Sequence, residues 1–159
     1  MPKPQRVRDP VHDLIAFRDD NEIDQIAWRL INTREFQRLR RIKQLGFSDL
    51  VYPGATHSRF AHCIGVYHTA RRLIGIVAHK LPAADRRPEQ ERAVLLGALL
   101  HDIGHGPLSH AFEHALGGKR HIDWGAEIVL GDTEVNAVLR DVDDHLPAEI
   151  ASLLKEEQP

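Results

Sequence analysis

The chain has 159 residues, of which 42% are hydrophobic and 28% are charged, a composition that indicates one ordinary globular domain and excludes a disordered segment. Its net charge of −2 excludes a chain that is basic throughout and binds nucleic acid with its whole surface. The sequence contains neither a membrane span of ~20 apolar residues nor the apolar stretch of a signal peptide, and Cys63 is its single cysteine. We therefore expect a cytoplasmic protein without disulfides and without a membrane partner.

The first third of the chain predicts a short extended segment followed by two helices. Residues 7–18 mix apolar side chains with turn formers and predict a short extended piece or a hairpin. Apolar residues then recur every three or four positions over residues 23–31, which is typical of an amphipathic helix. A second helix is expected over residues 33–45, with Gly46 as its C-terminal cap, and residues 47–57 predict a loop.

The remaining elements are also predicted to be helical. A long helix is expected over residues 58–79, with a buried stripe formed by Cys63, Val66, Ala70, Leu73 and Val77. Residues 89–103 are apolar all round at their centre, which predicts a buried helix that ends at Gly104. Shorter helices are expected after Pro107 and over residues 123–130, 133–142 and 147–157. Because strand signals are nearly absent, we expect the all-α class, a bundle of helices.

Charge and histidine are unevenly distributed along the sequence. Residues 1–80 carry 14 Lys and Arg against 8 Asp and Glu, whereas residues 81–159 carry 7 against 15. This asymmetry indicates either an anionic ligand near the first half or attraction between the two halves within one fold. Five of the eleven histidines fall between His101 and His121, which marks this segment as a candidate functional site.

The pair His101-Asp102 stands at the predicted end of the buried helix. A charged carboxylate is unfavourable there unless it is paired or bound to a cation, and imidazole with carboxylate is a ligand set for Zn²⁺, Mn²⁺ or Fe²⁺. Adjacent helical residues point about 100° apart, so further ligands must come from another helix. The alternative interpretation is structural: an aspartate that accepts a hydrogen bond from a local backbone amide beside a satisfied histidine.

Three segments together resemble one family. They are NTREFQRLRRIKQLG at 32–46, PGATHSRFAH at 53–62 and HDIGHGPLSH at 101–110. In this order they resemble the HD-domain phosphohydrolases, and within them the branch of deoxynucleoside triphosphate (dNTP) triphosphohydrolases that includes the dGTPases. The resemblance implies an HD-domain helical bundle and hydrolysis at the α-phosphorus, which releases a deoxynucleoside and intact triphosphate.

The resemblance also implies roles for particular residues and a cofactor. It assigns metal ligation to His62, His101 and Asp102, and substrate phosphate binding to Arg59. It assigns catalytic positions to His105, His110, Glu113 and His121. The implied cofactor is one divalent transition metal per site, which is Mn, Fe, Zn, Ni or Co, with Mg as a further ion for the substrate. Such a metal polarises a phosphoryl oxygen and lowers the pKa of a water molecule.

A second implied site lies in the arginine-rich segment. Residues 29–43 carry a net charge of +5, and in the family the matching element helps to bind a regulatory nucleotide between subunits. The residues at the matching positions are Asn32, Gln37, Arg40 and Gln44. The resemblance therefore implies a homo-oligomer with a nucleotide partner, and the open alternative is a solvated basic helix face.

One metal ligand of the family has no match in this sequence, an Asp on a helix well downstream of the His-Asp pair. The acidic residues at 141, 143 and 144 come too early to match it. We therefore expect one incomplete HD domain over residues 1–159, with an extended segment at 1–20 and a helical core over about 21–140, as the N-terminal portion of a larger enzyme. The alternatives are an HD phosphohydrolase acting on another nucleotide or phosphate ester, and a non-catalytic remnant that binds nucleotide or, less favoured, nucleic acid.

Overall fold

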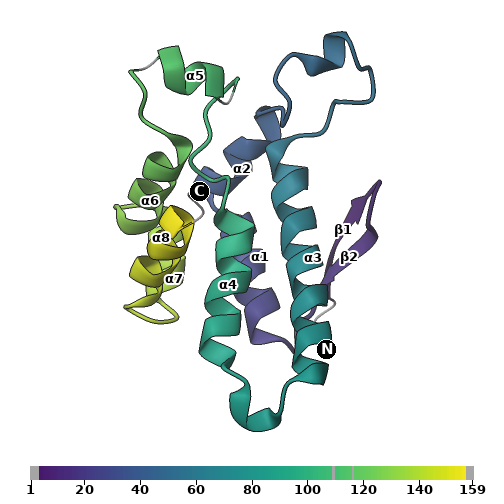
Figure 1. The fold of residues 1–159 in the computed structure, drawn as a ribbon, viewed down its shortest axis with the longest axis vertical. Coiled ribbons are helices and arrows are strands. Elements are labelled where there is room, and N and C mark those ends of the chain that lie inside the picture. The colour runs from purple at the N-terminus through teal and green to yellow at the C-terminus, as the bar shows by residue number, and fades with distance from the viewer. Residues whose placement is uncertain (1–3, 109, 116, 157–159) are drawn as a thin grey trace.

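Helices make up the body of the molecule and confirm the all-α class (Figure 1). The computed structural model describes residues 4–108, 110–115 and 117–156. Its α-helices are α1 (Glu22–Ile31), α2 (Arg34–Gln37), α3 (Arg59–Lys80), α4 (Pro88–Leu100), α5 (His110–Ala115), α6 (His121–Leu130), α7 (Glu134–Arg140) and α8 (Leu146–Glu156). Its shorter elements are the strands β1 (Gln5–Asp9) and β2 (Asp13–Phe17) and the 3₁₀ helices η1 (Arg38–Arg41), η2 (Ser48–Leu50) and η3 (Ala83–Asp85).

The extended segment is a β-hairpin that lies beside α3 at the edge of the bundle (Figure 1). β1 pairs with β2 in antiparallel register, with Val7 opposite Ile15. Asp9 closes the turn, because its Oδ1 accepts hydrogen bonds from the backbone N–H groups of Val11 and His12, both at 2.9 Å. Ile15 is fully buried, so the inner face of β2 joins the core. Of the two alternatives expected over residues 7–18, a short extended piece or a hairpin, the structure shows the hairpin.

The predicted buried helix is α4, which stands in the middle of the bundle. It packs against α3 on one side and α8 on the other, and α8 also packs against α6. The apolar centre of α4 is buried, and so are Ile150 and Leu154 of α8. The hydrophobic core therefore continues past residue 140 into the last described helix. In the described residues, no helix is both long enough and apolar enough to cross a membrane.

A buried carboxylate joins the hairpin, α1 and α3. Asp24 on α1 is 1% exposed and accepts hydrogen bonds from the Tyr67 hydroxyl and from Arg71 Nη1, each at 2.6 Å. Its other oxygen accepts a hydrogen bond from the backbone N–H of Arg18, just after β2, at 3.0 Å. Burial raises the pKa of the Tyr67 phenol well above its usual value, so this hydroxyl stays a donor. Because Tyr67 and Arg71 both belong to α3, Asp24 helps to set which face of α3 turns inward.

The helix expected over residues 33–45 is wrong beyond Arg41. α2 and η1 together end at Arg41, and Ile42 is extended and buried. The backbone N–H of Arg59 donates to the Ile42 carbonyl at 2.8 Å, and Lys43 forms a bridge with Ser58. Pairing with the start of α3 therefore replaces the last helical turn. Leu45, three residues after the buried Ile42, is 51% exposed.

The buried stripe expected on α3 is also wrong in its C-terminal part. Cys63 is fully buried, but Leu73 and Val77 are 57% and 51% exposed. The core side of α3 is formed instead by Phe60, Ile64 and Tyr67, a face turned by more than a quarter of the helix circumference. Both faces of α3 carry apolar residues, so periodicity alone could not choose between them.

We predict that Asp24→Asn destabilises the fold by about 3 kcal/mol, because it removes a buried charge that two donors of α3 and a backbone amide share. Chemical denaturation followed by circular dichroism measures this change. The control is Asp20→Asn, which removes an exposed partner of Arg18 and should leave the unfolding midpoint unchanged. Equal midpoints for both variants would contradict the role given to Asp24.

Candidate metal centre

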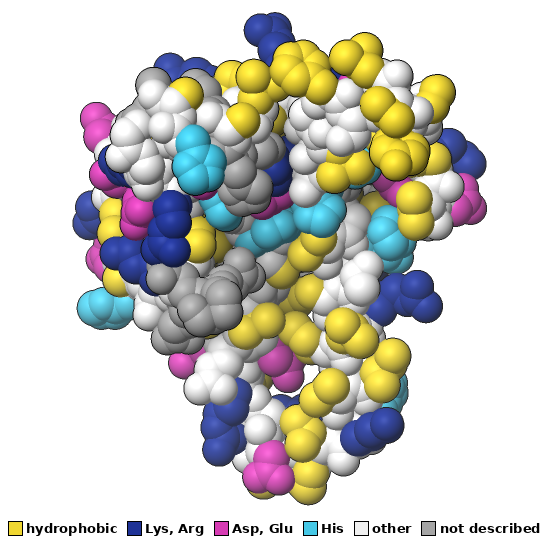
Figure 2. Space-filling model, turned by 45° about the horizontal axis from the view of Figure 1, so that its top comes forward, with side chains coloured by type: hydrophobic (Ala, Val, Ile, Leu, Met, Phe, Trp, Pro, Cys, Tyr) yellow, Lys and Arg dark blue, Asp and Glu magenta, His cyan; other side chains and the backbone are white. Residues whose placement is uncertain are grey.

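The candidate metal ligands come from the facing ends of α3 and α4. Ser58 caps α3 with its side chain, which places Arg59 and His62 in the first turn of that helix. His101 directly follows the last residue of α4, and Asp102 comes next in the turn that ends the helix. In Figure 2, histidine side chains gather in a hollow near the middle of the visible face. The fold therefore brings together residues that are about 40 positions apart.

Three potential ligands predicted from the sequence form one cluster. The ligand atoms of His62, His101 and Asp102 all lie within 4.8 Å of one another. The two Nε2 atoms are 3.3 Å apart, and the Asp102 oxygens lie 3.6 Å from His101 Nε2 and 3.9 Å from His62 Nε2. Two helices thus supply two imidazoles and one carboxylate to the same point.

The hydrogen bonds around these imidazoles suit metal binding. His101 Nδ1 lies 2.9 Å from the carbonyl oxygen of Ala98, and because a carbonyl only accepts, Nδ1 carries the proton and Nε2 the lone pair. Burial lowers the pKa of His62, which favours its neutral form. Two imidazole nitrogens bound to one ion at about 2.1 Å stand roughly 3.0–3.4 Å apart, which matches the separation of 3.3 Å. The residues present therefore fit a divalent metal.

Asp102 is the electrostatic centre of the cluster. It is 5% exposed; its Oδ2 accepts a hydrogen bond from Arg59 Nη1 at 2.5 Å, and its Oδ1 lies 3.2 Å from His105 Nε2. Burial by itself would raise the pKa of this carboxyl. The hydrogen bond from His105 and the charge of Arg59 outweigh burial and hold the pKa of Asp102 well below its usual range. Asp102 is therefore an anion at neutral pH, as a metal ligand must be.

Arg59 lies inside the cluster, where the resemblance places a phosphate-binding residue. Its side chain is 5% exposed and binds Asp102, and its Nη2 lies 3.5 Å from the carbonyl oxygen of Gln44. A guanidinium is thereby fixed beside the candidate metal position. Contact with a substrate phosphate stays a prediction.

Three of the four predicted catalytic residues meet on the His105 side of Asp102. Glu113 Oε1 lies 2.8 Å from His121 Nδ1 and accepts a hydrogen bond from the backbone N–H of His121 at 3.2 Å. The rings of His105 and His121 are stacked, with centroids 3.8 Å apart. Burial lowers the pKa of His105 and favours its neutral form. The side chain of the fourth residue, His110, lies outside the described part of the chain.

A second group of potential metal ligands shares Asp102. Its members, Asp102, His105 and His121, also have ligand atoms within 4.8 Å of one another. An imidazole binds a metal in the plane of its ring, yet these two rings stack face to face at an angle of 10° and 3.8 Å apart. One ion cannot lie in both ring planes. The geometry therefore favours the group that contains His62 and His101.

The predicted regulatory residues divide between two places. Gln37 and Arg40 lie together on the surface of α2 and η1, where Arg40 Nε donates to Gln37 Oε1 at 2.7 Å. Asn32 is exposed at the C-terminal cap of α1. Gln44 lies instead at the metal cluster, with its Nε2 3.5 Å from Asp102 Oδ2. Of the four residues, only Gln44 lies in contact with the candidate centre in the described structure.

Arg38 belongs to the site, although no sequence motif singled it out. Its Nη1 donates to the carbonyl oxygen of His105 at 2.6 Å, and its Nη2 donates to the carbonyl oxygen of Ile103. It thus holds the backbone on both sides of Gly104. The available signal was the arginine-rich segment, but local pattern does not distinguish Arg38, which turns inward, from the exposed Arg40 two positions later.

Gly104 allows the turn after His101-Asp102 to approach α6. A Cβ added at Gly104 would lie 1.9 Å from the carbonyl oxygen of His121 and 2.3 Å from the backbone nitrogen of Gly125. Both neighbours are backbone atoms of a packed helix and cannot turn aside. The absence of a side chain at Gly104 is therefore what lets His105 and His121 meet.

Comparison with known proteins adds the family context. The family model described as HD domain matches residues 59–159. The uncharacterized protein YwfO of Bacillus subtilis is 48% identical over 148 residues, which cover 92% of this chain and 32% of that protein. The deoxynucleoside triphosphate triphosphohydrolase SAMHD1 of Bos taurus is 41% identical over 107 residues, which cover 67% of this chain and 17% of that protein.

Solved structures agree with this family. A phosphohydrolase from Bacteroides thetaiotaomicron matches with a TM-score of 0.74 and 29% identity, covering 99% of this chain and 36% of that one. A hypothetical protein from Aquifex aeolicus matches with a TM-score of 0.75 and 31% identity, covering 99% of this chain and 39% of that one. The chain thus spans between about a sixth and two fifths of the length of these relatives.

We predict that Gly104→Ala destabilises the protein by about 3 kcal/mol or more, because the added methyl group would overlap the backbone of α6. Thermal and urea unfolding measure the effect. The matched control is Gly75→Ala on α3, where nothing lies within 4 Å of the added Cβ, and where alanine should stabilise the helix by roughly 0.5–1 kcal/mol. If Gly104→Ala were as stable as the unmodified chain, the close approach of the turn to α6 would be wrong.

Proposed function

The chain belongs to the HD domain family, and from the geometry of its site we propose that it is a metal-dependent phosphohydrolase. The observation that carries this proposal is the cluster of His62, His101 and Asp102, whose ligand atoms lie within 4.8 Å of one another. Imidazole and carboxylate together suit Mn, Fe, Zn, Ni or Co as divalent ions. Similarity to the Bacteroides phosphohydrolase supports the same class of reaction.

The residues of the cluster have separable tasks in this proposal. His62, His101 and Asp102 would hold the metal, and three protein ligands leave a position open, as in catalytic sites. A bound divalent ion supplies Lewis-acid chemistry, since it polarises a phosphoryl oxygen and lowers the pKa of a nearby water molecule. Arg59 compensates the charge of Asp102. In this proposal its guanidinium also stabilises the negative charge that develops on the substrate phosphate in the transition state. Asp102 therefore connects the metal and the phosphate-binding side.

The acid–base part of the reaction falls to the second group of residues. Glu113 accepts the Nδ1 proton of His121 and so fixes its tautomer and its orientation. His105 donates to Asp102 and orients the carboxylate. We assign His110 as the residue that gives a proton to the leaving oxygen, an assignment that rests on the HDIGHGPLSH segment.

We infer that the substrate is a dNTP, which is cleaved to a deoxynucleoside and triphosphate. In this reaction water attacks the α-phosphorus, the bond to the 5′ oxygen breaks, and that oxygen takes up a proton. The support is the similarity to SAMHD1 of Bos taurus, whose name states this activity. The chain covers 17% of that protein, so the comparison supports the substrate class through the shared segments alone.

Two further features of the family are proposals for this chain. The half-buried Gln37 and the exposed Arg40 form a hydrogen-bonded polar pair, and this pair and the exposed Asn32 are the groups proposed to contact a nucleotide bound between subunits of a homo-oligomer. Gln44 suits a different task, because its side chain lies beside Asp102 and can contact the substrate. A distal Asp ligand, which the resemblance implies for the related enzymes, would increase the affinity for the metal. In this proposal the three ligands described here already hold the ion.

We predict that the chain with Mn²⁺ releases a deoxynucleoside and triphosphate from at least one of the four dNTPs, and that a chelator abolishes this release. Product analysis by anion-exchange chromatography distinguishes triphosphate from orthophosphate and pyrophosphate. His101→Ala with Asp102→Ala should lower turnover by more than about 100-fold, because two metal ligands are lost.

The control variant is His145→Ala, which removes an exposed histidine far from the cluster in sequence and should leave turnover unchanged. Release of orthophosphate or pyrophosphate would contradict cleavage of a dNTP to deoxynucleoside and triphosphate. It would still agree with a metal-dependent phosphohydrolase. Turnover that survives both the chelator and the double substitution would contradict the metal-dependent reaction itself.

A further inference from the structure

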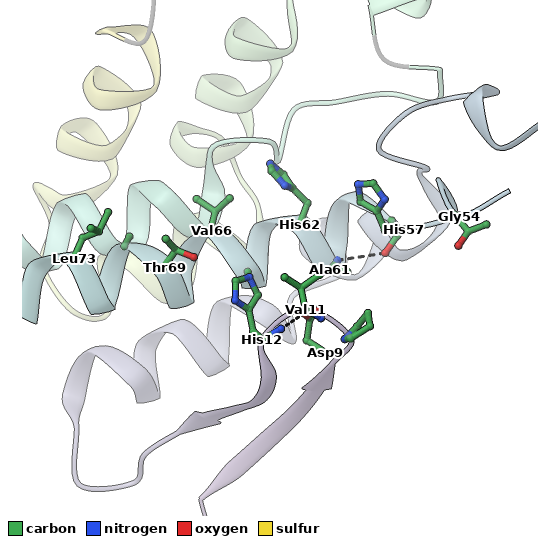
Figure 3. Close-up of a pocket in the computed structure, with 15 residues that line it drawn as sticks. Asp9, Val11, His12, Gly54, His57, Ala61, His62, Val66, Thr69 and Leu73 are labelled. Atoms are coloured by element: carbon green, nitrogen blue, oxygen red, sulfur yellow. Dashed lines mark hydrogen bonds between the residues drawn. The ribbon is translucent and has the colours of Figure 1, made fainter. Parts of the chain in front are cut away.

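We propose that Arg38 is a positioning residue that holds the two halves of the metal centre in register, a role that rests on the proposed function. One half, His62, belongs to α3, and the other, His101 and Asp102, follows the end of α4. Figure 3 shows His62 near the start of α3, just after the loop that carries His57. The two halves are separate elements, so a third segment that contacts both can fix their spacing.

The segment that contains η1 is fastened to the first half. The backbone N–H of Arg59, the first residue of α3, donates to the carbonyl oxygen of Ile42 at 2.8 Å. The guanidinium of Arg40 lies over the ring of Phe60, with its Cζ 3.6 Å from the ring centroid. Between Arg38 and Arg40, Leu39 is fully buried and anchors η1 in the core. The position of η1 is therefore tied to the first turn of α3.

Arg38 connects the same segment to the second half. Its Nη1 donates to the carbonyl oxygen of His105 at 2.6 Å, and its Nη2 donates to the carbonyl oxygen of Ile103. His105 and Ile103 are 3% and 0% exposed, and buried carbonyl groups need donors from within the protein. In a continuing helix the donor to Ile103 would be residue 107, but Pro107 has no N–H. One planar guanidinium thus serves two carbonyl groups of the turn.

The turn that Arg38 holds sets the direction of Asp102. His105 Nε2 lies 3.2 Å from Asp102 Oδ1, and the backbone N–H of His105 donates to the carbonyl oxygen of Asp102 at 3.1 Å. A displacement of the carbonyl groups at 103 and 105 would therefore move Asp102, and with it the adjacent His101, relative to His62. Groups that orient metal ligands change metal affinity without touching the ion. Arg38 fits this description, because it contacts the backbone of the turn.

The first experiment follows amide hydrogen exchange by NMR in the intact, metal-free chain. Arg38→Lys keeps the positive charge but replaces the guanidinium fork by a single ammonium group, which does not span both carbonyls. The amides of Ile103 and His105 should exchange at least about tenfold faster in this variant. The amide of Leu96, in the buried centre of α4, should change by less than about threefold, because it reports on the stability of the whole fold.

The second experiment measures Mn²⁺ binding by isothermal titration calorimetry. Arg38→Lys should raise the Kd for Mn²⁺ by about 10- to 100-fold. Arg38→Gln, which retains one amide donor group, is a second variant and should change the Kd in the same direction. The matched control is Arg41→Lys, which alters an exposed side chain of the same 3₁₀ helix and should change neither exchange nor Kd. Thermal melts verify that all three variants fold.

Three outcomes would overturn the role of Arg38 alone. They are unchanged exchange at Ile103 and His105 in Arg38→Lys, equal acceleration at these amides and at Leu96, and a Kd for Mn²⁺ within about twofold of the unmodified chain. The second of these outcomes would indicate a contribution to overall stability only. An unmodified chain that binds no Mn²⁺ would contradict the proposed function and this role together. The two failures are distinguishable, because the latter does not depend on residue 38.

Discussion

The buried carboxylate of Asp102 is the constraint on which the rest of the structure depends. An ionised aspartate that is 5% exposed would be strongly unfavourable without compensation. The elements packed around it supply the compensating donors. α3 contributes Arg59 and His62, and the turn after α4 contributes His101 and His105. The packing of α3 against α4, and of the turn against α6, therefore positions the residues that compensate the charge of Asp102. The same compensation keeps Asp102 anionic and aimed at the point where the two imidazole nitrogens converge.

Attraction within the fold explains part of the uneven charge distribution. Arg29 of α1 binds Asp141 at 2.7 Å, and the backbone N–H of Arg34 donates to Glu134 at 2.6 Å. These contacts tie the basic first half to the acidic second half, although exposed pairs of this kind add little stability. Much of the remaining positive charge stays exposed, on Arg6 of β1, on Arg40 and Arg41 of η1, and on Arg72 and Lys80 of α3. The arginine-rich segment thus serves two purposes, since Arg38 turns inward to hold the turn at the site while Arg40 stays on the surface.

Local signals predicted most of the element types, and the sequence motifs picked out three residues that the fold brings together, but neither was sufficient where two apolar faces or two partners compete. The apolar centre of α4 is unambiguous in sequence, and the structure buries it. On α3 the choice between two faces depends on Asp24, a contact with a residue 43 positions away, so periodicity chose the wrong face. Beyond Arg41 the chain pairs with the start of α3, which no local pattern announces. Arg38 was missed for the same reason, because its inward direction follows from tertiary packing.

The central claim is that His62, His101 and Asp102 hold one divalent metal. A crystal structure of the chain grown with Mn²⁺, with an anomalous difference map at the manganese edge, tests it most directly. The account predicts one strong peak at about 2.0–2.3 Å from His62 Nε2, His101 Nε2 and a carboxylate oxygen of Asp102. A peak between Asp102, His105 and His121 would contradict it, as would a map without any peak near Asp102.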